Sequence, residues 1–244
     1  MTSHSKLFFF AASASVLLSA GTQAQVLLSE TFPNDGGLTT TPQDNGWTNE
    51  QGPVGEQNVT GGRLFLNDDE TEDTYVFLDD FVFSGTITAT FQLEIDINDT
   101  PSSAAGEFFT SFRSNSGGLF GRVFTLAPVD STANAFRLGV SSGTSSANAI
   151  FSMAFTAGTV YDLTLTYDFA TDLTTLSVPG FGSITSTDAA DTSNIGSYSF
   201  RQTAMSGDMF IDNLLVVPEP STYALLGIGL LVCVKRVRRS LLSK

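Results

Sequence analysis

A strict alternation of apolar and polar residues is the feature that most limits how this chain can fold. Across residues 159–169 the aliphatic and aromatic side chains fall at every second position, and residues 86–98 repeat the pattern with polar residues between. Successive side chains of a β-strand point to opposite faces, so each segment predicts a strand with one buried face. The polar turn at residues 168–172 predicts a hairpin into residues 173–178.

Most of the chain between residues 25 and 217 has the same character. Its β-prone segments are separated by clusters of Gly, Asn, Asp and Ser, and none of them has a helical period. The further strands predicted are residues 26–32, 62–66, 75–83, 107–112, 119–126, 135–140, 149–155, 198–202 and 209–216. Many short strands form a sandwich or a barrel, and we expect an all-β sandwich of two antiparallel sheets over residues 25–217.

The N-terminus carries the pattern of an export signal. Lys6 precedes an apolar run at residues 7–18, and the small residues Thr22 and Ala24 stand where signal peptidase reads the chain. We therefore expect residues 1–24 to be a signal peptide, cut by signal peptidase between Ala24 and Gln25. An uncleaved anchor is the alternative, although the run is short for a membrane span.

The C-terminal residues 218–244 combine prolines, an apolar run and a basic tail. Pro218 and Pro220 oppose helix formation, so a helix is expected to begin after them, capped by Ser221 or Thr222. The uncharged run 223–234 would make a helix about 18 Å long, against about 30 Å of bilayer hydrocarbon. The basic residues that should hold its end in the cytoplasm are Lys235, Arg236, Arg238 and Arg239. We expect a single short transmembrane helix, with the rest of the chain outside.

This tail closely resembles the PEP-CTERM sorting signal of exopolysaccharide-producing Gram-negative bacteria. The motif that carries the resemblance is Pro218, Glu219, Pro220, Ser221 and Thr222, followed by the apolar run and the basic tail. The resemblance implies an exosortase, a membrane-embedded cysteine peptidase, that cuts near the motif. The protein would then be held transiently in the inner membrane before it reaches the cell surface or extracellular matrix, where exopolysaccharide is an expected partner. A permanent C-terminal anchor is the alternative.

Composition excludes several kinds of chemistry in residues 25–217. The histidine of the chain is His4 and its cysteine is Cys233, so both lie in the predicted terminal signals. The domain therefore has no Ser-His-Asp or Cys-His nucleophile, no disulfide, and no zinc, haem or iron–sulfur site of the usual kind. We expect a domain with no cofactor, apart from the calcium considered below.

The domain is also strongly acidic. Residues 25–217 hold 24 acidic residues and 5 arginines, a formal charge of −19, and the three lysines lie in the terminal signals. Such a charge repels nucleic acid and anionic lipid. It suits divalent cations and neutral polysaccharides.

A second, fold-level resemblance lies within the domain. Residues 136–140 and 157–176 are similar to the later half of concanavalin A-like (LamG-type) jelly rolls, and residues 45–48, 61–64 and 211–214 resemble the opening and close of such domains. The resemblance implies a concanavalin A-like architecture and leaves function open.

Glu94, Asp96 and Asn98 are the strongest enzymatic candidates. They resemble the Glu-x-Asp-x-Glu strand of concanavalin-like β-glucanases, in which alternation places all three carboxylates on one face. The resemblance implies Glu94 as nucleophile and Asp96 as its electrostatic helper. Asn98, however, replaces the acid/base residue and cannot exchange a proton. A solvated strand face is the alternative, and we expect no enzyme activity.

Two further groups suggest ligands. Asp68, Asp69, Glu70 and Asp73 could give calcium the six to eight oxygens that it prefers, but they lack EF-hand spacing, and acidic clusters of this kind usually form solvated loops. Trp47 follows an Asn-Gly turn, where an exposed ring would contact glycan and a buried one would cap the core.

The sequence therefore leaves three functions open. We expect an exported, non-enzymatic surface or matrix protein that binds polysaccharide weakly. The alternatives are a glycan hydrolase that uses Glu94 and Asp96, and a structural envelope protein with no ligand.

Overall fold

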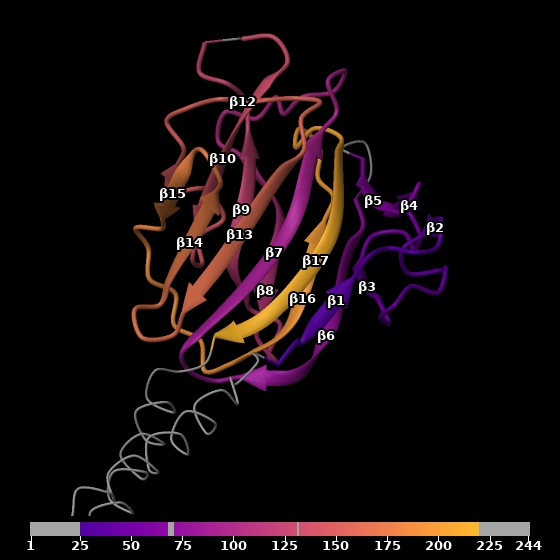
Figure 1. Ribbon diagram of the computed structural model, residues 1–244, viewed down its shortest axis with the longest axis vertical. Helices are drawn as coiled ribbons and strands as arrows, with labels where there is room; N and C mark the ends of the chain where they lie inside the picture. The colour runs from indigo at the N-terminus through magenta and orange to yellow at the C-terminus, as the bar shows by residue number, and fades with distance from the viewer. Residues whose placement is uncertain (1–24, 68–70, 131, 220–244) are drawn as a thin grey trace, which may run out of the picture.

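The computed structural model describes residues 25–67, 71–130 and 132–219 (Figure 1). Across these ranges the chain forms strands, turns and loops, and it has no helix of the length and apolarity that a membrane span requires. The predicted signal peptide (residues 1–24) and the predicted transmembrane helix and basic tail lie outside the described residues.

The first of two antiparallel sheets has nine strands. They are β1 (Leu28–Glu30), β2 (Gly36–Gly37), β4 (Asn58–Thr60), β5 (Arg63–Leu66), β7 (Thr86–Ile95), β13 (Tyr161–Asp168), β14 (Leu173–Val178), β15 (Gly182–Thr185) and β17 (Met209–Glu219). Their order is β15-β14-β13-β7-β17-β5-β4-β2, and β1 also pairs with β17.

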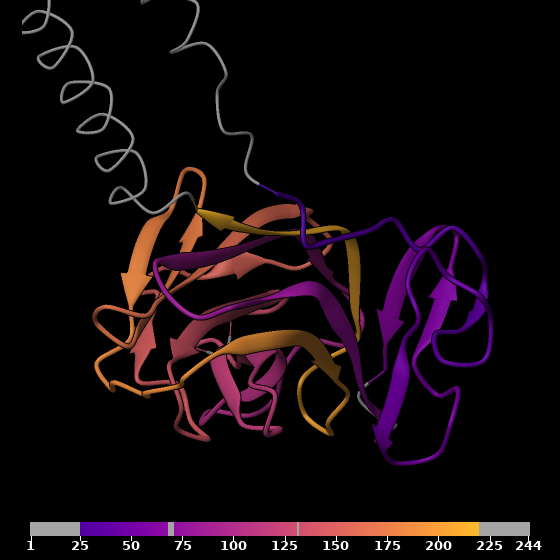
Figure 2. The same cartoon turned by 90° about the horizontal axis from the view of Figure 1, so that it is seen from below.

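The second sheet has eight strands. They are β3 (Thr48–Gln51), β6 (Asp73–Val82), β8 (Glu107–Arg113), β9 (Leu119–Leu126), β10 (Ala135–Ser141), β11 (Ala149–Ile150), β12 (Phe155–Thr156) and β16 (Ile195–Arg201). Their order is β11-β10-β9-β8-β16-β6-β3, with β12 beside β10. Figure 2 shows the two sheets as two layers, with β17 in one and β16 in the other. The predicted all-β sandwich is confirmed.

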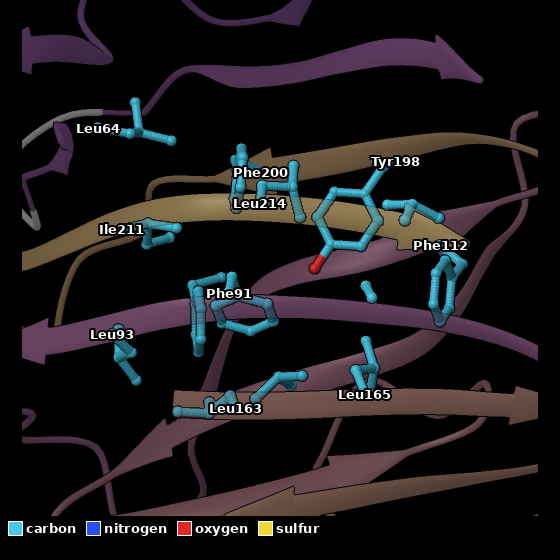
Figure 3. Close-up of a cluster of buried hydrophobic side chains, with 14 of the residues drawn as sticks. Leu64, Phe91, Leu93, Phe112, Leu163, Leu165, Tyr198, Phe200, Ile211 and Leu214 are labelled. Atoms are coloured by element: carbon cyan, nitrogen blue, oxygen red, sulfur yellow. The ribbon is translucent and has the colours of Figure 1, made fainter. Parts of the chain in front are cut away.

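The core fills the space between the sheets. β7 and β13 pair in the register that the alternation predicts, with Leu163 opposite Phe91 and Leu165 opposite Ala89, and all four are buried. Figure 3 shows Phe91, Leu163 and Leu165 in one cluster with Phe112, Tyr198 and Phe200 of the second sheet. Burying each large apolar side chain contributes about 1.5–3 kcal/mol, so this interface is the main source of stability.

Several predicted strand boundaries were wrong. The strand expected at residues 86–98 ends at Ile95, because the Asp96 carboxylate accepts the backbone N–H of Asn98 at 2.7 Å and closes a turn. The strand expected at residues 149–155 is two short strands, β11 and β12, which pair with different parts of β10. The short strands β2, β3, β4 and β15 were not predicted.

β17 continues two residues beyond Val217, into the predicted sorting signal. Pro218 lies opposite Ile87 and Glu219 opposite Thr86 on β7. The pairing of β1 with β17 stops at Val216, so Pro218 lies beyond that ladder, where its missing N–H is tolerated. The beginning of the Pro-Glu-Pro motif is thus part of the folded sheet.

Candidate functional site

The three residues of the predicted catalytic strand do not form one carboxylate cluster. The Glu94 carboxylate accepts a hydrogen bond of 2.6 Å from Arg63, whose guanidinium also lies 4.3 Å from the centre of the Phe210 ring. Asp96 lies beyond the end of β7, where its carboxylate accepts two hydrogen bonds from Asn98. Glu94 is therefore in an ion pair, and Asp96 shapes a turn.

The structure places Trp47 in the core, with 7% of its surface exposed. Its ring stacks on Phe200 at 5.3 Å between centroids and lies 6.3 Å from Phe32. The indole N–H donates to the buried carboxylate of Glu30 at 3.0 Å. This burial favours the core-capping role of Trp47, and the glycan contact stays a prediction.

The predicted calcium set is only partly described. Asp68, Asp69 and Glu70 lie outside the described residues, and Asp73 begins β6 with its carboxylate 3.6 Å from the Arg201 Nε. Burial raises the pKa of Asp73, and Arg201 offsets part of this rise. Within residues 25–67, 71–130 and 132–219, no three His, Cys, Asp or Glu side chains are grouped as metal ligands would be. Calcium binding stays a prediction.

The sorting motif is also divided. Pro218 and Glu219 belong to β17, whereas Pro220, Ser221, Thr222 and the basic residues Lys235, Arg236, Arg238 and Arg239 lie outside the described residues. So does Ala24, next to the predicted signal-peptidase site; Gln25 is the first described residue and is exposed.

The outer face of the eight-stranded sheet gathers arginines and aromatic rings. Residues that lie opposite each other on paired strands share a face, so Tyr75, Phe77 and Arg201 point away from the core residues Tyr198 and Phe200. The same register argument on the neighbouring strands completes the set. We define the arginine–aromatic face as Tyr75, Phe77, Phe108, Arg113, Arg122, Phe124, Arg137 and Arg201. It holds four of the five arginines of the domain.

One end of this face is an exposed aromatic surface beside a buried cation. Phe77 is 59% exposed and meets Tyr75 edge to face, with 5.3 Å between ring centroids. The Arg113 guanidinium lies 4.5 Å from the centre of the Tyr75 ring and forms an ion pair with Glu50. Its side chain is only 6% exposed. Its Nε and Nη1 have no hydrogen-bond partner in the described part of the chain.

The centre of the face places two cations on one ring. The guanidinium carbons of Arg122 and Arg201 lie 4.9 and 4.6 Å from the centre of the Phe108 ring. β8, which carries Phe108, runs between β9 and β16, which carry the two arginines. Phe124 supports the Phe108 ring edge to face at 5.9 Å.

A rigid loop borders this centre. Arg122 donates to the carbonyl oxygen of Thr144 at 3.0 Å. The Asp188 carboxylate holds the same loop by accepting the N–H groups of Ser142, Gly143 and Thr144 at 2.9–3.0 Å. Burial opposes ionisation of Asp188, but these hydrogen bonds and one from Asn148 bring its pKa well below the ordinary value. The Asp188 carboxylate is therefore occupied by its hydrogen bonds to this loop.

The sequence did not indicate this face, because its members come from five strands spread over residues 75–201. One signal was available. In β6 both alternating sets are partly apolar, since Tyr75 and Phe77 alternate with Val76 and Leu78. A solvated face rarely carries two consecutive aromatic positions.

Comparison with known proteins agrees with both resemblances. Residues 216–239 match the PEP-CTERM protein-sorting motif. The lectin UEA-II in complex with galactose superposes with a TM-score of 0.50 at 12% identity, covering 80% of this chain and 99% of the lectin. The Emp47p carbohydrate recognition domain gives a TM-score of 0.49 at 14% identity, covering 81% of this chain and 99% of that domain.

A sialidase also matches, with a TM-score of 0.49 at 14% identity over 79% of this chain, but the chain spans only 19% of the sialidase's length. No curated protein matches in sequence. The chain thus carries a PEP-CTERM motif on a concanavalin A-like, lectin-type sandwich. The motif implies export through an exosortase-dependent sorting system. At these identities the structural likeness describes the fold alone.

Proposed function

We propose that this protein is a non-enzymatic component of the cell surface or extracellular matrix that binds polysaccharide through the arginine–aromatic face. The sorting motif supports delivery to the exterior, and the rigid sheet supports a fixed array of contacts. The proposal refines the weak polysaccharide binding expected from sequence and moves it from Trp47 to the outer face of the eight-stranded sheet.

The observation that carries this proposal is the exposure of Phe77 beside Tyr75. A phenylalanine that is 59% exposed on a regular strand loses the stabilisation that burial would give it. Flat rings next to hydrogen-bond donors are the surfaces on which sugars stack, and Arg113 lies over the Tyr75 ring.

The absence of catalysis is part of the proposal. Retaining hydrolysis needs two carboxylates about 5 Å apart, one of them able to exchange a proton. Glu94 is neutralised by Arg63, and the Asp96 carboxylate accepts the N–H groups of Asn98. These contacts support a binding role over the hydrolase alternative.

Polysaccharide binding can be measured with the full-length chain in detergent micelles. Affinity electrophoresis through gels that contain dextran, laminarin, alginate or dextran sulfate would report retardation by each polymer. We expect retardation by at least one polymer, and Phe77→Ser should reduce it several-fold. Val160→Ser is the matched control, because Val160 is 52% exposed and lies beside Arg63 and Glu94 of the other sheet, just before β13.

Equal mobility in all gels would overturn the proposal and favour a structural protein with no ligand. Retardation that Val160→Ser reduces as much as Phe77→Ser would place binding elsewhere. Release of reducing sugars from any of these polymers would revive the hydrolase alternative.

A further inference from the structure

We infer that Arg122 and Arg201, which both lie over the Phe108 ring, form a binding site for the anionic group of an acidic polysaccharide, a carboxylate or a sulfate ester. This inference rests on the proposed function and names its ligand class. It differs from the neutral polysaccharide that the overall charge of the domain suggests.

The first argument is the unusual placement of like charges. The domain has 24 acidic residues and 5 arginines, yet two arginines share one ring, at 4.9 and 4.6 Å from its centre. Each cation–π contact contributes only about 0.5–2 kcal/mol, and mutual repulsion opposes it. Burial lowers the pKa of Arg122, and the nearby charge of Arg201 lowers it further. An anion bound by both guanidinium groups would relieve this repulsion.

The second argument is that the neighbouring carboxylates pair only loosely with the two arginines. Asp73 forms an ion pair with Arg201, but its carboxylate stands 3.6 Å from the Arg201 Nε, longer than a hydrogen bond. Asp188 lies near enough to raise the pKa of Arg122, but it accepts three backbone N–H groups of the bordering loop. The Nε atoms of both arginines are buried without a hydrogen-bond partner among the described residues. Since these Nε atoms are buried, an anion would be bound by the exposed ends of the guanidinium groups, and the Arg201 side chain is 38% exposed.

The third argument is chemical fit. A guanidinium presents a planar fork of N–H groups that binds carboxylate and sulfate oxygens in pairs. The side chains of Arg122, Phe108 and Arg201 lie on three adjacent strands, so their spacing is set by the sheet. Phe77 and Tyr75 lie on β6, the next strand after β16, and can receive the neighbouring sugar ring. A polysaccharide with an acidic group on one of its sugars fits this arrangement.

The test compares three defined probes with the full-length chain in detergent micelles. Isothermal titration would use alginate oligosaccharides for carboxylates, sulfated dextran oligosaccharides for sulfate esters, and unmodified dextran oligosaccharides of equal length. We expect one of the acidic probes to bind at least tenfold more tightly than dextran. Arg201→Gln and Arg122→Gln should each remove at least tenfold of that affinity.

Arg63→Gln is the matched control. Arg63 also lies over a phenylalanine, its side chain is 36% exposed against 38% for Arg201, and it faces away on the other sheet. This substitution changes the net charge equally and should leave the affinity unchanged. Because Arg201→Gln also removes the ion pair with Asp73, its thermal midpoint is compared with that of wild type to establish that the fold is retained. Arg201→Lys keeps the positive charge but lacks the planar fork of N–H groups. Its affinity for the acidic probe should therefore lie between those of wild type and Arg201→Gln.

The outcomes separate this inference from the proposed function. The anion site would be overturned if an acidic probe bound Arg201→Gln as tightly as wild type. It would also be overturned if Arg63→Gln reduced the affinity as much as Arg201→Gln does. Dextran binding that depends on Phe77 but on neither arginine would leave the proposed function standing and overturn the inference. Absence of binding by all three probes and in the gel assay would overturn both.

Discussion

The Glu219 carboxylate accepts a hydrogen bond of 2.8 Å from the hydroxyl of Thr86, the first residue of β7. Glu219 is the middle residue of the Pro-Glu-Pro motif, and its backbone also lies opposite Thr86 in the sheet. The first two residues of the motif that the sorting peptidase is expected to recognise, Pro218 and Glu219, are thus paired with β7 in the folded domain. Processing then requires the last residues of β17 to leave the edge of β7.

Thr86→Val should accelerate processing of the tail in the native host. The substitution keeps the β-branched shape and removes the hydroxyl, so Glu219 loses a contact worth less than about 1 kcal/mol at this exposed position. The fraction of cleaved chain over time, measured by pulse-chase and mass spectrometry of the mature C-terminus, reports the effect. Thr90→Val, on the same strand, is the control. Identical cleavage kinetics in the two variants would show that this contact does not limit processing.

Trp47→Phe should destabilise the domain without reducing polysaccharide binding. The smaller ring loses the indole N–H that donates to the buried Glu30 carboxylate, which costs about 1–3 kcal/mol of unfolding free energy. Urea unfolding measures the stability, and the gel assay measures the binding. Loss of binding with unchanged stability would restore Trp47 as a glycan contact.

Asp188 should make stability depend on pH in the acidic range. Its pKa is lower in the folded protein than in the unfolded chain, so its contribution is present above the ordinary value of about 3.9 and is lost as pH falls below it. The unfolding free energy of wild type should exceed that of Asp188→Asn at pH 6, and this advantage should shrink between pH 4 and pH 3. Asp35→Asn, at an exposed loop position, is the control. A difference that stays constant over this range would contradict the prediction.

The sequence predicted the strands that have one buried face, because the alternation of apolar and polar residues depends only on local spacing. β13 and its partners β7 and β14 were recognised in this way. The arginine–aromatic face was not, because Phe108, Arg122 and Arg201 meet only through sheet order. Trp47 was ambiguous for the same reason, since the partner that holds its indole N–H, Glu30, lies 17 residues away. Composition also led us to count every acidic residue as surface charge, although Glu30 and Glu72 are fully buried.

Glu72 shows what such a buried carboxylate does. Its oxygens accept hydrogen bonds from the Thr39 hydroxyl at 2.9 Å, the Asn49 amide at 3.0 Å, and the backbone N–H groups of Gly55 and Gln57 at 3.1 and 2.6 Å. The side chain therefore joins the segment at residues 39–57, which includes β3, to the start of β6. It has no ion-pair partner within the described ranges, so hydrogen bonds alone offset the cost of burying it.

Glu72→Gln should consequently lower the unfolding free energy by about 2–4 kcal/mol, because the new amide group turns a donor toward backbone N–H groups that need an acceptor. Relief of the buried charge acts in the opposite direction, but four donors would lose charge-assisted bonds. Urea unfolding provides the measurement. Glu56→Gln is the control, since its carboxylate accepts only one exposed hydrogen bond, from Thr71, among the described residues. Equal unfolding midpoints for the two variants would mean that removing the buried charge compensates for the lost hydrogen bonds.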